Sequence, residues 1–388
     1  MQVIYALEEF PKTFKKAIFL AGPTTRLKWL VSWRPEALHL LETSGYDGVV
    51  FVPEPRPGTV RWWGWDDQVA WEVRGLNLAD VIVFWVPRNL VNLPGLTTNV
   101  EYGEWFKSGK IVLGAPKSAD KVRYLKKRGV EYFVPQADTL VQTIDEALAI
   151  IGDGALRQGG ECQVPLHIWR TPSFQSWYQA QLKVGNRLDG ARVEYVLRVG
   201  PKLNFLFLWI LRVNIYVASE RRNKTNESVI SRSDISSVLL YKKGKDIYDT
   251  TVVLVKEFRS PVSNSDGFVH ELPGGSSFKP DKDPLMVAAS EVFEETSLKL
   301  DPGRVVPLDG RQLAATLSAH KALLFSVALT DKELAYLRSQ SGIAQGNDGD
   351  SERTYVEVAT VADILRNDLA DWSTLGMIFS GLSKVFMK

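Results

Sequence analysis

Cysteine is nearly absent from this chain, which has a single one, Cys162, among 388 residues. A lone cysteine excludes an intramolecular disulfide framework and is typical of proteins that work in a reducing compartment. The first 16 residues are of mixed polarity and lack the apolar core of a signal peptide. We therefore expect a cytoplasmic protein whose folding does not depend on disulfides.

The chain also lacks a large excess of charge and a long apolar run. It has 47 Lys and Arg against 45 Asp and Glu, and the net charge of +2 gives no global field to recruit nucleic acid or an anionic membrane. The most apolar run, 205–211, ends at Arg212 and is far shorter than the ~20 residues that span a bilayer. We expect a small-molecule partner and no nucleic acid or membrane, and the sequence leaves a homo-oligomer open.

Hydrophobic periodicity divides the first 155 residues into alternating strands and helices. Strands are predicted at 17–21, 49–52, 81–86, 111–113 and 132–134, and amphipathic helices at 35–43, 67–78 and 139–151. This alternation predicts an α/β domain with a doubly wound parallel sheet over residues 1–155. Ala21-Gly22-Pro23 follows the first strand, where a nicotinamide-binding domain would have G-x-G-x-x-G, so we expect no cofactor in this domain.

The pattern changes after residue 151. Four glycines fall within 152–160, and we predict a linker and connecting segment over 156–189, followed by a C-terminal domain over 190–388. Strands rich in β-branched and aromatic residues are predicted at 192–199, 203–218, 237–241 and 250–258, and a helix at 284–297. Several strands followed by a few helices predict an α+β domain.

Two carboxylates carry the chemistry expected of the first domain. A helix is predicted after the strand 81–86, with Thr98 or Asn99 as its N-cap. Glu101 then lies in the first turn at the carboxyl end of a strand, where open α/β sheets bind ligands. Glu72 lies 29 residues upstream on another predicted helix. Two carboxylates from separate elements can cleave a glycosidic bond, one as the nucleophile and one at the leaving group.

Five short motifs surround these carboxylates: Phe19-Leu20-Ala21-Gly22-Pro23, Trp33-Arg34, Trp71-Glu72, Ala79-Asp80 and Glu101-Tyr102-Gly103. In order and spacing they resemble the nucleoside 2-deoxyribosyltransferase-like family over residues 16–135. The resemblance implies that Glu101 is the nucleophile at the anomeric carbon of a nucleoside and that Glu72 contacts the base. It also implies substrate-binding positions at Phe19, Gly22, Asp80 and Asn99, with a hydrogen-bonded structural role as the alternative for Asp80.

The chain departs from that family in two places. The family usually has Asp where this chain has Glu72, and often has an acidic residue in the loop 88–100, which has none here. Base preference and the choice between hydrolase and transferase therefore stay open. Each carboxylate also has a structural interpretation, because an N-terminal Glu101 would stabilise its helix by ~0.3–1 kcal/mol and Glu72 can be a solvated charge.

A second chemical pattern lies in the C-terminal domain. Glu291, Glu294 and Glu295 are spaced i, i+3 and i+4, so they share one face of the predicted helix. Clustered carboxylates favour a hard divalent cation such as Mg²⁺, which prefers oxygen ligands. A Pro-Gly-Gly turn at 273–275 precedes the helix and would come to the same place.

The order Leu272-Pro273-Gly274-Gly275, then Glu291-Val292-Phe293-Glu294-Glu295, resembles a Nudix box. The segment 190–385 is similar to the ADP-ribose pyrophosphatase branch of that superfamily. The resemblance implies a Nudix-like domain with Mg²⁺ bound by Glu291, Glu294 and Glu295. In this chain Ser290 replaces the Arg of the box, Ser297 replaces its Gly, and the early Glu is at best Asp281.

The preferred hypothesis is a bifunctional enzyme of nucleotide metabolism. The first domain cleaves an N-glycosidic bond or exchanges the base, and the second hydrolyses or binds a nucleoside diphosphate-linked compound with Mg²⁺. In one alternative the Nudix-like domain is a sensor that binds a nucleotide without turnover. In another it is the only active enzyme, and the first domain is a scaffold.

Overall fold

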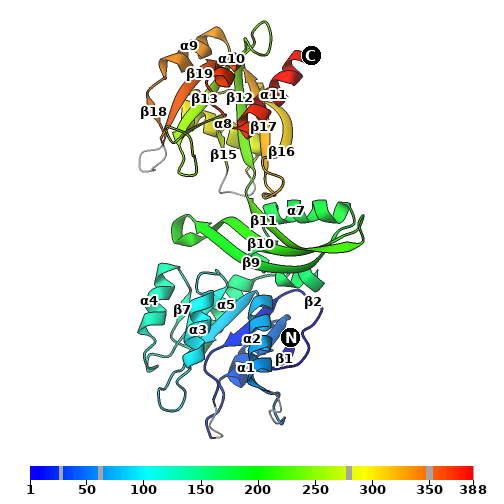
Figure 1. The fold of residues 1–388 in the computed structure, drawn as a ribbon. Helices are drawn as coiled ribbons and strands as arrows, with labels where there is room; N and C mark the ends of the chain where they lie inside the picture. Colours follow the sequence, from blue (N-terminus) through cyan, green and yellow to red (C-terminus); the bar gives the residue numbers. More distant parts are fainter. Residues whose placement is uncertain (26–28, 60–63, 277–281, 347–352, 388) are drawn as a thin grey trace. The chain divides into compact units, whose positions relative to one another are not determined.

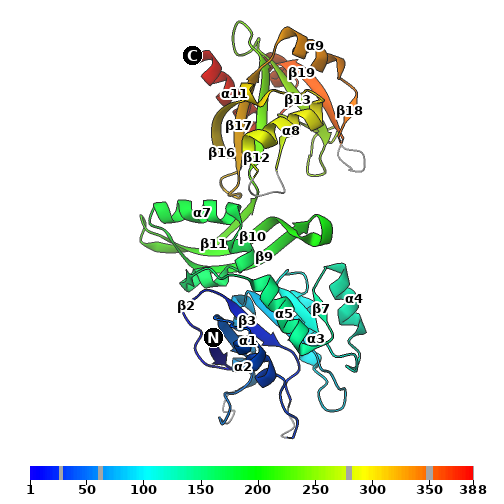
Figure 2. The same cartoon turned by 180° about the vertical axis from the view of Figure 1, so that it is seen from behind.

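The computed structural model describes residues 1–25, 29–59, 64–276, 282–346 and 353–387. Its contacts divide the chain into two units, Met1–Ser231 and Arg232–Lys388, which Figures 1 and 2 show from opposite sides. The first unit extends past residue 190, where the sequence patterns placed the start of the C-terminal domain. None of the helices in the described ranges combines the length and the apolar character needed to cross a bilayer.

Six parallel strands form the main sheet of the first unit, in the order β1-β4-β3-β5-β6-β7. They are β1 (Gln2–Tyr5), β3 (Ala17–Ala21), β4 (Val49–Val52), β5 (Val81–Trp85), β6 (Ile111–Gly114) and β7 (Gln136–Ala137). Every residue of β3, β4 and β5 is buried, which explains why these strands are continuous apolar runs.

Helices cover both faces of this sheet. The helices α1 (Arg34–Thr43) and α5 (Leu140–Ile151) pack in one apolar cluster. The cluster on the other face contains residues of α2 (Trp65–Leu78), α3 (Leu96–Trp105) and α4 (Arg123–Glu131). The prediction of an α/β domain with a doubly wound parallel sheet is therefore confirmed. The strand order reverses between β3 and β5, and such a switch point is where open α/β sheets bind ligands.

The predicted strand at 132–134 is wrong. Tyr132 and Val134 both donate their backbone N–H to Gly129 O, so this segment closes the last turn of α4. Phe133 lies in the left-handed region with φ of 52°, which is uncommon for a residue with a side chain. The end of the helix thus overrides the β propensity of these residues, and the chain joins the sheet only at β7.

The start of α3 also differs from the prediction. Gly95 is the N-cap, with φ of 56°, and the helix begins at Leu96 rather than after Thr98 or Asn99. Glycine adopts this left-handed conformation without a steric penalty. Glu101 therefore lies in the second turn of α3, where the helix dipole contributes little to its stability.

The remainder of the first unit is a second, smaller sheet with two helices. The elements are a short pair, β2 (Thr13–Phe14) with β8 (Arg157–Gln158), then η1 (Gly159–Gln163), α6 (Leu166–Trp169), α7 (Pro172–Lys183), β9 (Arg187–Val199), η2 (Pro201–Leu203), β10 (Phe205–Val217) and β11 (Arg222–Arg232). The last three strands pair in the order β11-β10-β9. The apolar run 205–211 lies in β10, where Trp209 is fully buried against Phe174 of α7.

The second unit contains a mixed sheet. Its order is β16-β17-β12-β13-β19-β18, with β14 beside β13 and β15 beside β12, and β12 runs parallel to β17 but antiparallel to β13. The strands are β12 (Ile235–Lys242), β13 (Thr251–Phe258), β14 (Phe268–Glu271), β15 (Gly274–Gly275), β16 (Val306–Gln312), β17 (Lys321–Ala328), β18 (Ala344–Gln345) and β19 (Thr354–Thr360).

Helices cover both faces of the mixed sheet as well. One apolar cluster contains residues of α8 (Pro284–Thr296) and α9 (Asp331–Ser339), and another contains residues of α10 (Val361–Arg366) and α11 (Trp372–Met387). Leu239 and Leu240 of β12 fall in different clusters, because successive strand residues point to opposite faces. A domain with a mixed sheet is thus present, and its Nudix-like identity stays a prediction.

Candidate active site

Glu72 and Glu101 come from the two helices that flank β5 in the sequence. Glu72 is on α2, which leads into the strand, and Glu101 is on α3, which follows it. Both helices pack in the same apolar cluster and therefore on the same face of the sheet. The two carboxylates are close enough for the charge of Glu72 to raise the pKa of Glu101. The structure thus brings together the two residues that the sequence singled out.

The pKa of Glu101 is raised from 4.5 to about 7. Burial is the largest cause, and the negative charge of Glu72 is the next. The positive charge of Arg34 acts in the opposite direction, and Glu104 raises the pKa further. A carboxyl group with a pKa near 7 is divided between its protonated and ionised forms at neutral pH, so it can serve as a nucleophile or as an acid.

Arg34 is the main residue of this site that sequence reasoning left without a role. Its side chain is 1% exposed, and its Nη1 atom lies 2.6 Å from Glu54 Oε1. Nη1 also donates to Thr24 Oγ1, while Nε donates to Leu20 O and Nη2 to Gly22 O. The guanidinium therefore joins the carboxyl ends of β3 and β4.

The charge of Arg34 also acts on the carboxylates. Burial lowers the pKa of Arg34, whereas the carboxylates of Glu54, Glu72 and Glu101 raise it. An arginine next to apolar strand ends has to be paired, since burying an isolated charge is costly. Trp33-Arg34 belongs to the motifs quoted above, but a buried arginine looks the same as an exposed one in a sequence.

Gln68 holds the carboxylate of Glu72 in place. Gln68 Nε2 donates to Glu72 Oε1 at 2.7 Å, one turn along α2, and to Pro53 O at 3.3 Å. The neighbouring Trp71 is buried, and its Nε1 donates to Glu8 O at 3.0 Å. Trp71 is therefore an anchor of the core, while Gln68 fixes one oxygen of Glu72.

Residues 15–119 are similar to the family described as nucleoside 2-deoxyribosyltransferase like. This range, called the transferase-like segment below, runs from β3 past β6 and contains Arg34, Glu72 and Glu101. The resemblance inferred from the five motifs is confirmed for this range. The matched range does not reach the second unit, and no curated protein matches the chain.

Gly22 lies at the switch point of the transferase-like segment. Its φ is 142°, and a Cβ on Gly22 would lie 2.1 Å from Trp85 O at the end of β5. Only glycine allows the two strand ends to approach this closely. Gly22 thus shapes the place where the substrate is expected, and its contact with a substrate stays a prediction.

Asp80 makes the hydrogen bonds expected of a structural role, which the sequence left open as the alternative, and its substrate contact stays a prediction. It precedes β5 and so lies at the amino end of this strand, opposite the end that leads to α3. Asp80 is 4% exposed, and its oxygens accept bonds from Arg157 Nη1 at 2.9 Å, Arg157 Nη2 at 2.6 Å, and the backbone N–H of Ala17 and Leu166, both at 2.9 Å. These four bonds use the acceptor capacity of the carboxylate. The position of Asp80 directly before the strand was the signal in the sequence that it lies at the amino end of β5.

Phe19 and Asn99 make structural contacts, and their binding of a substrate stays a prediction. Phe19 is 1% exposed inside β3, and its ring centroid lies 6.2 Å from that of Trp71. Asn99 Oδ1 accepts a bond from Arg88 Nη2, and Asn99 lies about 200° around α3 from Glu101, since helical residues are about 100° apart. Phe19 therefore stabilises the core, and Asn99 holds Arg88.

In the second unit, two carboxylates of α8 contact the turn at β15. Glu295 is 9% exposed, and its Oε2 accepts the backbone N–H of Gly274 at 2.9 Å. A Cβ on Gly275 would lie 2.5 Å from Glu291 Cδ, so glycine is needed for this close approach. The Gly-Gly turn and α8 therefore lie in contact with each other.

The third carboxylate of the pattern, Glu294, contacts its own helix. Glu294 accepts a bond from Ser290 Oγ at 2.8 Å, one turn back on α8. Within the described ranges, no group of three or more His, Cys, Asp or Glu is arranged to hold a metal ion. Mg²⁺ binding by Glu291, Glu294 and Glu295 therefore stays a prediction. Asp281 lies outside the described residues.

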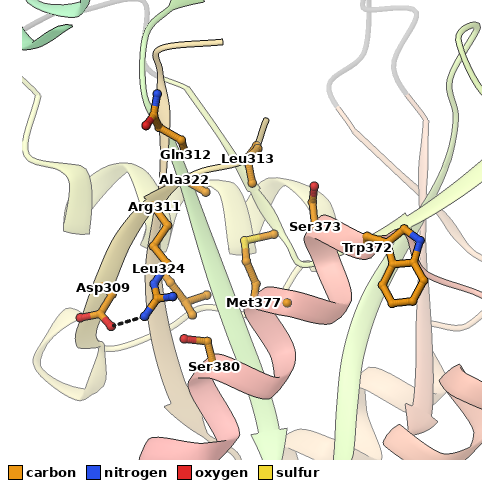
Figure 3. A pocket seen from close by; sticks show the side chains of 11 residues that line it. Asp309, Arg311, Gln312, Leu313, Ala322, Leu324, Trp372, Ser373, Met377 and Ser380 are labelled. Atoms are coloured by element: carbon orange, nitrogen blue, oxygen red, sulfur yellow. Dashed lines mark ion pairs between the residues drawn. The ribbon is translucent and has the colours of Figure 1, made fainter. Parts of the chain in front are cut away.

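A cavity of about 230 Å³ lies elsewhere in the second unit, between α11 and the strands β16 and β17 (Figure 3). Leu324 and Met377 are part of its apolar lining, and Asp309 and Arg311 pair beside it with 3.8 Å between Oδ2 and Nη2. The helix α11 packs in a different apolar cluster from α8. The cavity therefore lies on the other face of the sheet from the α8 carboxylates.

Proposed function

We propose that the first unit cleaves the N-glycosidic bond of a nucleoside or nucleotide through a glycosyl intermediate on Glu101. The observation that carries this proposal is the coupled pair of Glu72 and Glu101, which α2 and α3 bring together beside the β3–β5 switch point. The similarity of residues 15–119 to nucleoside 2-deoxyribosyltransferase-like proteins supports the same chemistry.

In this reaction a carboxylate oxygen of Glu101 attacks the anomeric carbon while the bond from that carbon to the base nitrogen breaks. The bonding electrons leave with the base, and the protonated carboxyl group of Glu72 supplies a proton to it. The half-reaction yields a free base and a glycosyl ester of Glu101. Water, or a second base in a transferase, then attacks the anomeric carbon, returns a proton to Glu72 and releases Glu101 as a carboxylate.

The charges around the pair suit this sequence of steps. In the reactive form the two acids hold one proton between them, and that proton is on Glu72 while Glu101 is ionised. The pair therefore titrates as a coupled unit. Arg34 lowers the pKa of Glu101 and so increases the fraction of enzyme with an ionised nucleophile. Gln68 donates to Glu72 Oε1 and so fixes one oxygen of the proposed proton donor.

A second assignment of roles has support in the same pair. A carboxyl group whose pKa is raised by burial is typical of a general acid, which would make Glu101 the proton donor and Glu72 the nucleophile. The two assignments predict opposite pH dependence near pH 7. With Glu101 as the nucleophile, activity rises through this range, whereas with Glu101 as the acid it falls.

The proposed activity is tested by incubating the full chain with a panel of nucleosides and nucleoside monophosphates. Free base is measured without and with a second base as acceptor. Release that needs no acceptor indicates a hydrolase, and release that needs an acceptor indicates a transferase. The matched control is Glu146→Gln, because Glu146 is an exposed carboxylate on α5, which packs on the other face of the sheet. Absence of base release across the panel would contradict the proposal.

For the second unit, we propose that it binds a nucleoside diphosphate-linked compound. The contacts of Glu291 and Glu295 with the Gly-Gly turn support this proposal. Ser297, which replaces the Gly of the box, has φ of 56°, so the backbone keeps the left-handed conformation that glycine favours. Binding without turnover is the simpler form of the proposal, since Ser290 replaces the Arg of the box. Thermal stabilisation by ADP-ribose without product formation would support it.

A further inference from the structure

A second cavity, of about 320 Å³, lies in the first unit between α3 and α4, which are neighbours in Figure 1. Its lining includes Tyr102, Gly103, Phe106, Lys121, Tyr124 and Arg128. Gly103 and Glu101 point about 200° apart on α3, because helical residues are about 100° apart. The cavity is therefore separate from the site at Glu101, although the two share a helix.

One wall of the cavity is aromatic. Tyr102 and Phe106 are buried, and their rings stack with centroids 6.1 Å apart and an interplanar angle of 16°. Tyr124 is 73% exposed on α4, so its ring is accessible to a ligand. Flat aromatic surfaces favour ligands with a planar ring, which stack or pack edge-on against them.

The cavity lining also includes two basic residues. Lys121 and Arg128 are part of its lining, and the guanidinium of Arg128 lies 5.1 Å from the ring centroid of Phe106. The helix α4 carries four basic residues and one acidic residue, Glu131, which pairs with Arg128. Cations next to aromatic rings suit an anionic ligand with a planar ring.

A buried arginine, Arg88, bonds to residues of the cavity lining. Arg88 is 5% exposed and donates to Lys121 O, Gly95 O and Asn99 Oδ1. Lys121 and Asn99 are among the residues that line the cavity. In the part of the chain that the structure describes, no carboxylate pairs with Arg88, and its Nε is buried without a partner. Burial lowers the pKa of Arg88. A buried cation without a counter-charge favours an anion nearby.

We propose that this cavity binds a nucleotide, with its base against Tyr102, Phe106 and Tyr124 and its phosphate near Lys121 and Arg128. The volume is in the range of small-molecule sites. Inorganic phosphate would leave the aromatic wall without a contact, and a free nucleoside would leave the cations without an anion. Binding at this site does not require any reaction at Glu101, so it is independent of the proposed function.

Photoaffinity labelling locates the ligand directly. The probe is 8-azidoadenosine 5′-monophosphate, applied to the full chain carrying Glu101→Gln so that turnover at the other site cannot consume it. We expect covalent label on peptides that contain Tyr124, which are distinct from the segment that carries position 101 of the proposed active site, and excess adenosine 5′-monophosphate should displace it. Labelling that spares the peptides with Tyr124 would overturn the proposal.

Charge variants test the phosphate contact. The double variant Lys121→Gln with Arg128→Gln should lower the labelling of these peptides at least about tenfold, since charge-assisted bonds to phosphate are the strong ones. Lys127→Gln is the matched control, because Lys127 is on α4 but does not belong to the cavity lining, and it should change labelling less than about twofold.

Two competitors separate the parts of the ligand. Adenosine and inorganic phosphate should each displace the probe at least about tenfold less well than adenosine 5′-monophosphate, because each makes only part of the contacts. Equal labelling of the double variant and the control, with both melting cooperatively, would overturn the phosphate contact. If inorganic phosphate displaced the probe as well as adenosine 5′-monophosphate does, the assignment of a nucleotide would be overturned.

Discussion

Arg34 Nη1 lies 2.6 Å from Glu54 Oε1, and this buried ion pair places a positive charge beside the coupled carboxylates Glu72 and Glu101. Arg34 donates to Leu20 O and Gly22 O at the carboxyl end of β3, and its partner Glu54 follows the carboxyl end of β4, so the pair joins the two strand ends. The same residue thus stabilises the sheet and lowers the pKa of Glu101. The two roles can be separated by mutation.

Arg34→Gln should raise the pKa of Glu101 above about 7, since the variant removes the charge that lowers it. The rise of kcat/KM with pH should then shift to higher pH by up to about one unit. The variant also leaves Glu54 buried without its partner, which should cost about 3 kcal/mol of unfolding free energy. Adding Glu54→Gln should recover stability but leave the pH profile shifted, and an unshifted profile would argue against the electrostatic role of Arg34.

Glu101→Gln should reduce base release at least ~10³-fold, because it removes the nucleophile. It should also change how stability depends on pH. The folded pKa of about 7 lies above the unfolded value of 4.5, so the folded state holds this proton more tightly, and wild-type stability falls as pH rises from 4.5 through 7.

The neutral amide avoids that loss. In urea unfolding the variant should therefore be more stable than the wild type at pH 8, by about 1–3 kcal/mol, and the difference should disappear below pH 4.5. Glu146→Gln, which changes an exposed carboxylate on α5, should show no comparable gain. A Glu101→Gln difference that is constant from pH 4 to pH 8 would contradict the raised pKa.

Glu72→Gln tests the proton donor, since the amide keeps the size and the bond from Gln68 but has no proton to give. Substrates whose bases leave poorly should slow by about 10²–10⁴-fold, whereas activated analogues should react almost normally. The measurement is kcat/KM across a series of bases of graded leaving ability. Uniform slowing across the series would make Glu72 a positioning residue, and unchanged rates would return it to a solvated helix position.

Arg157→Met tests the structural role of Asp80. The variant leaves a carboxylate that is 4% exposed without its cation, and we expect a loss of about 3–5 kcal/mol in unfolding free energy. Base release per folded molecule should stay within about twofold, because the pair lies at the amino end of β5. Arg187→Met, which breaks the exposed pair with Asp189, is the control and should change stability little. Lost activity in fully folded Arg157→Met would restore a substrate role to Asp80.

The double change Glu294→Gln with Glu295→Gln tests whether the two units work separately. It should abolish any Mg²⁺-dependent hydrolysis of ADP-ribose and leave base release unchanged, since effects at distant sites are independent. The amide oxygen that Glu295→Gln introduces can still accept the backbone N–H of Gly274, so the turn at β15 should be kept. Loss of both activities together would indicate one composite site.

Several features of the fold could be predicted because they depend on local sequence. β3, β4 and β5 are fully buried and so appear as apolar runs, and α1, α2 and α5 appear as amphipathic segments between them. The strand at 132–134 failed, since its residues are equally suited to the turn that closes α4. The edge strand β1 was not predicted, because only part of its surface is buried.

The sequence by itself determined the order of strands and helices, and with it the choice of Glu72 and Glu101, because buried runs and motif spacing are local properties. The tertiary structure decided what those carboxylates do to each other, since the pKa of Glu101 depends on burial and on charges 29 and 67 residues away in the chain. It also decided that Asp80 pairs with Arg157, that Asn99 pairs with Arg88 and that Phe19 is core. Electrostatic and packing interactions act through space, and a sequence records only neighbours along the chain.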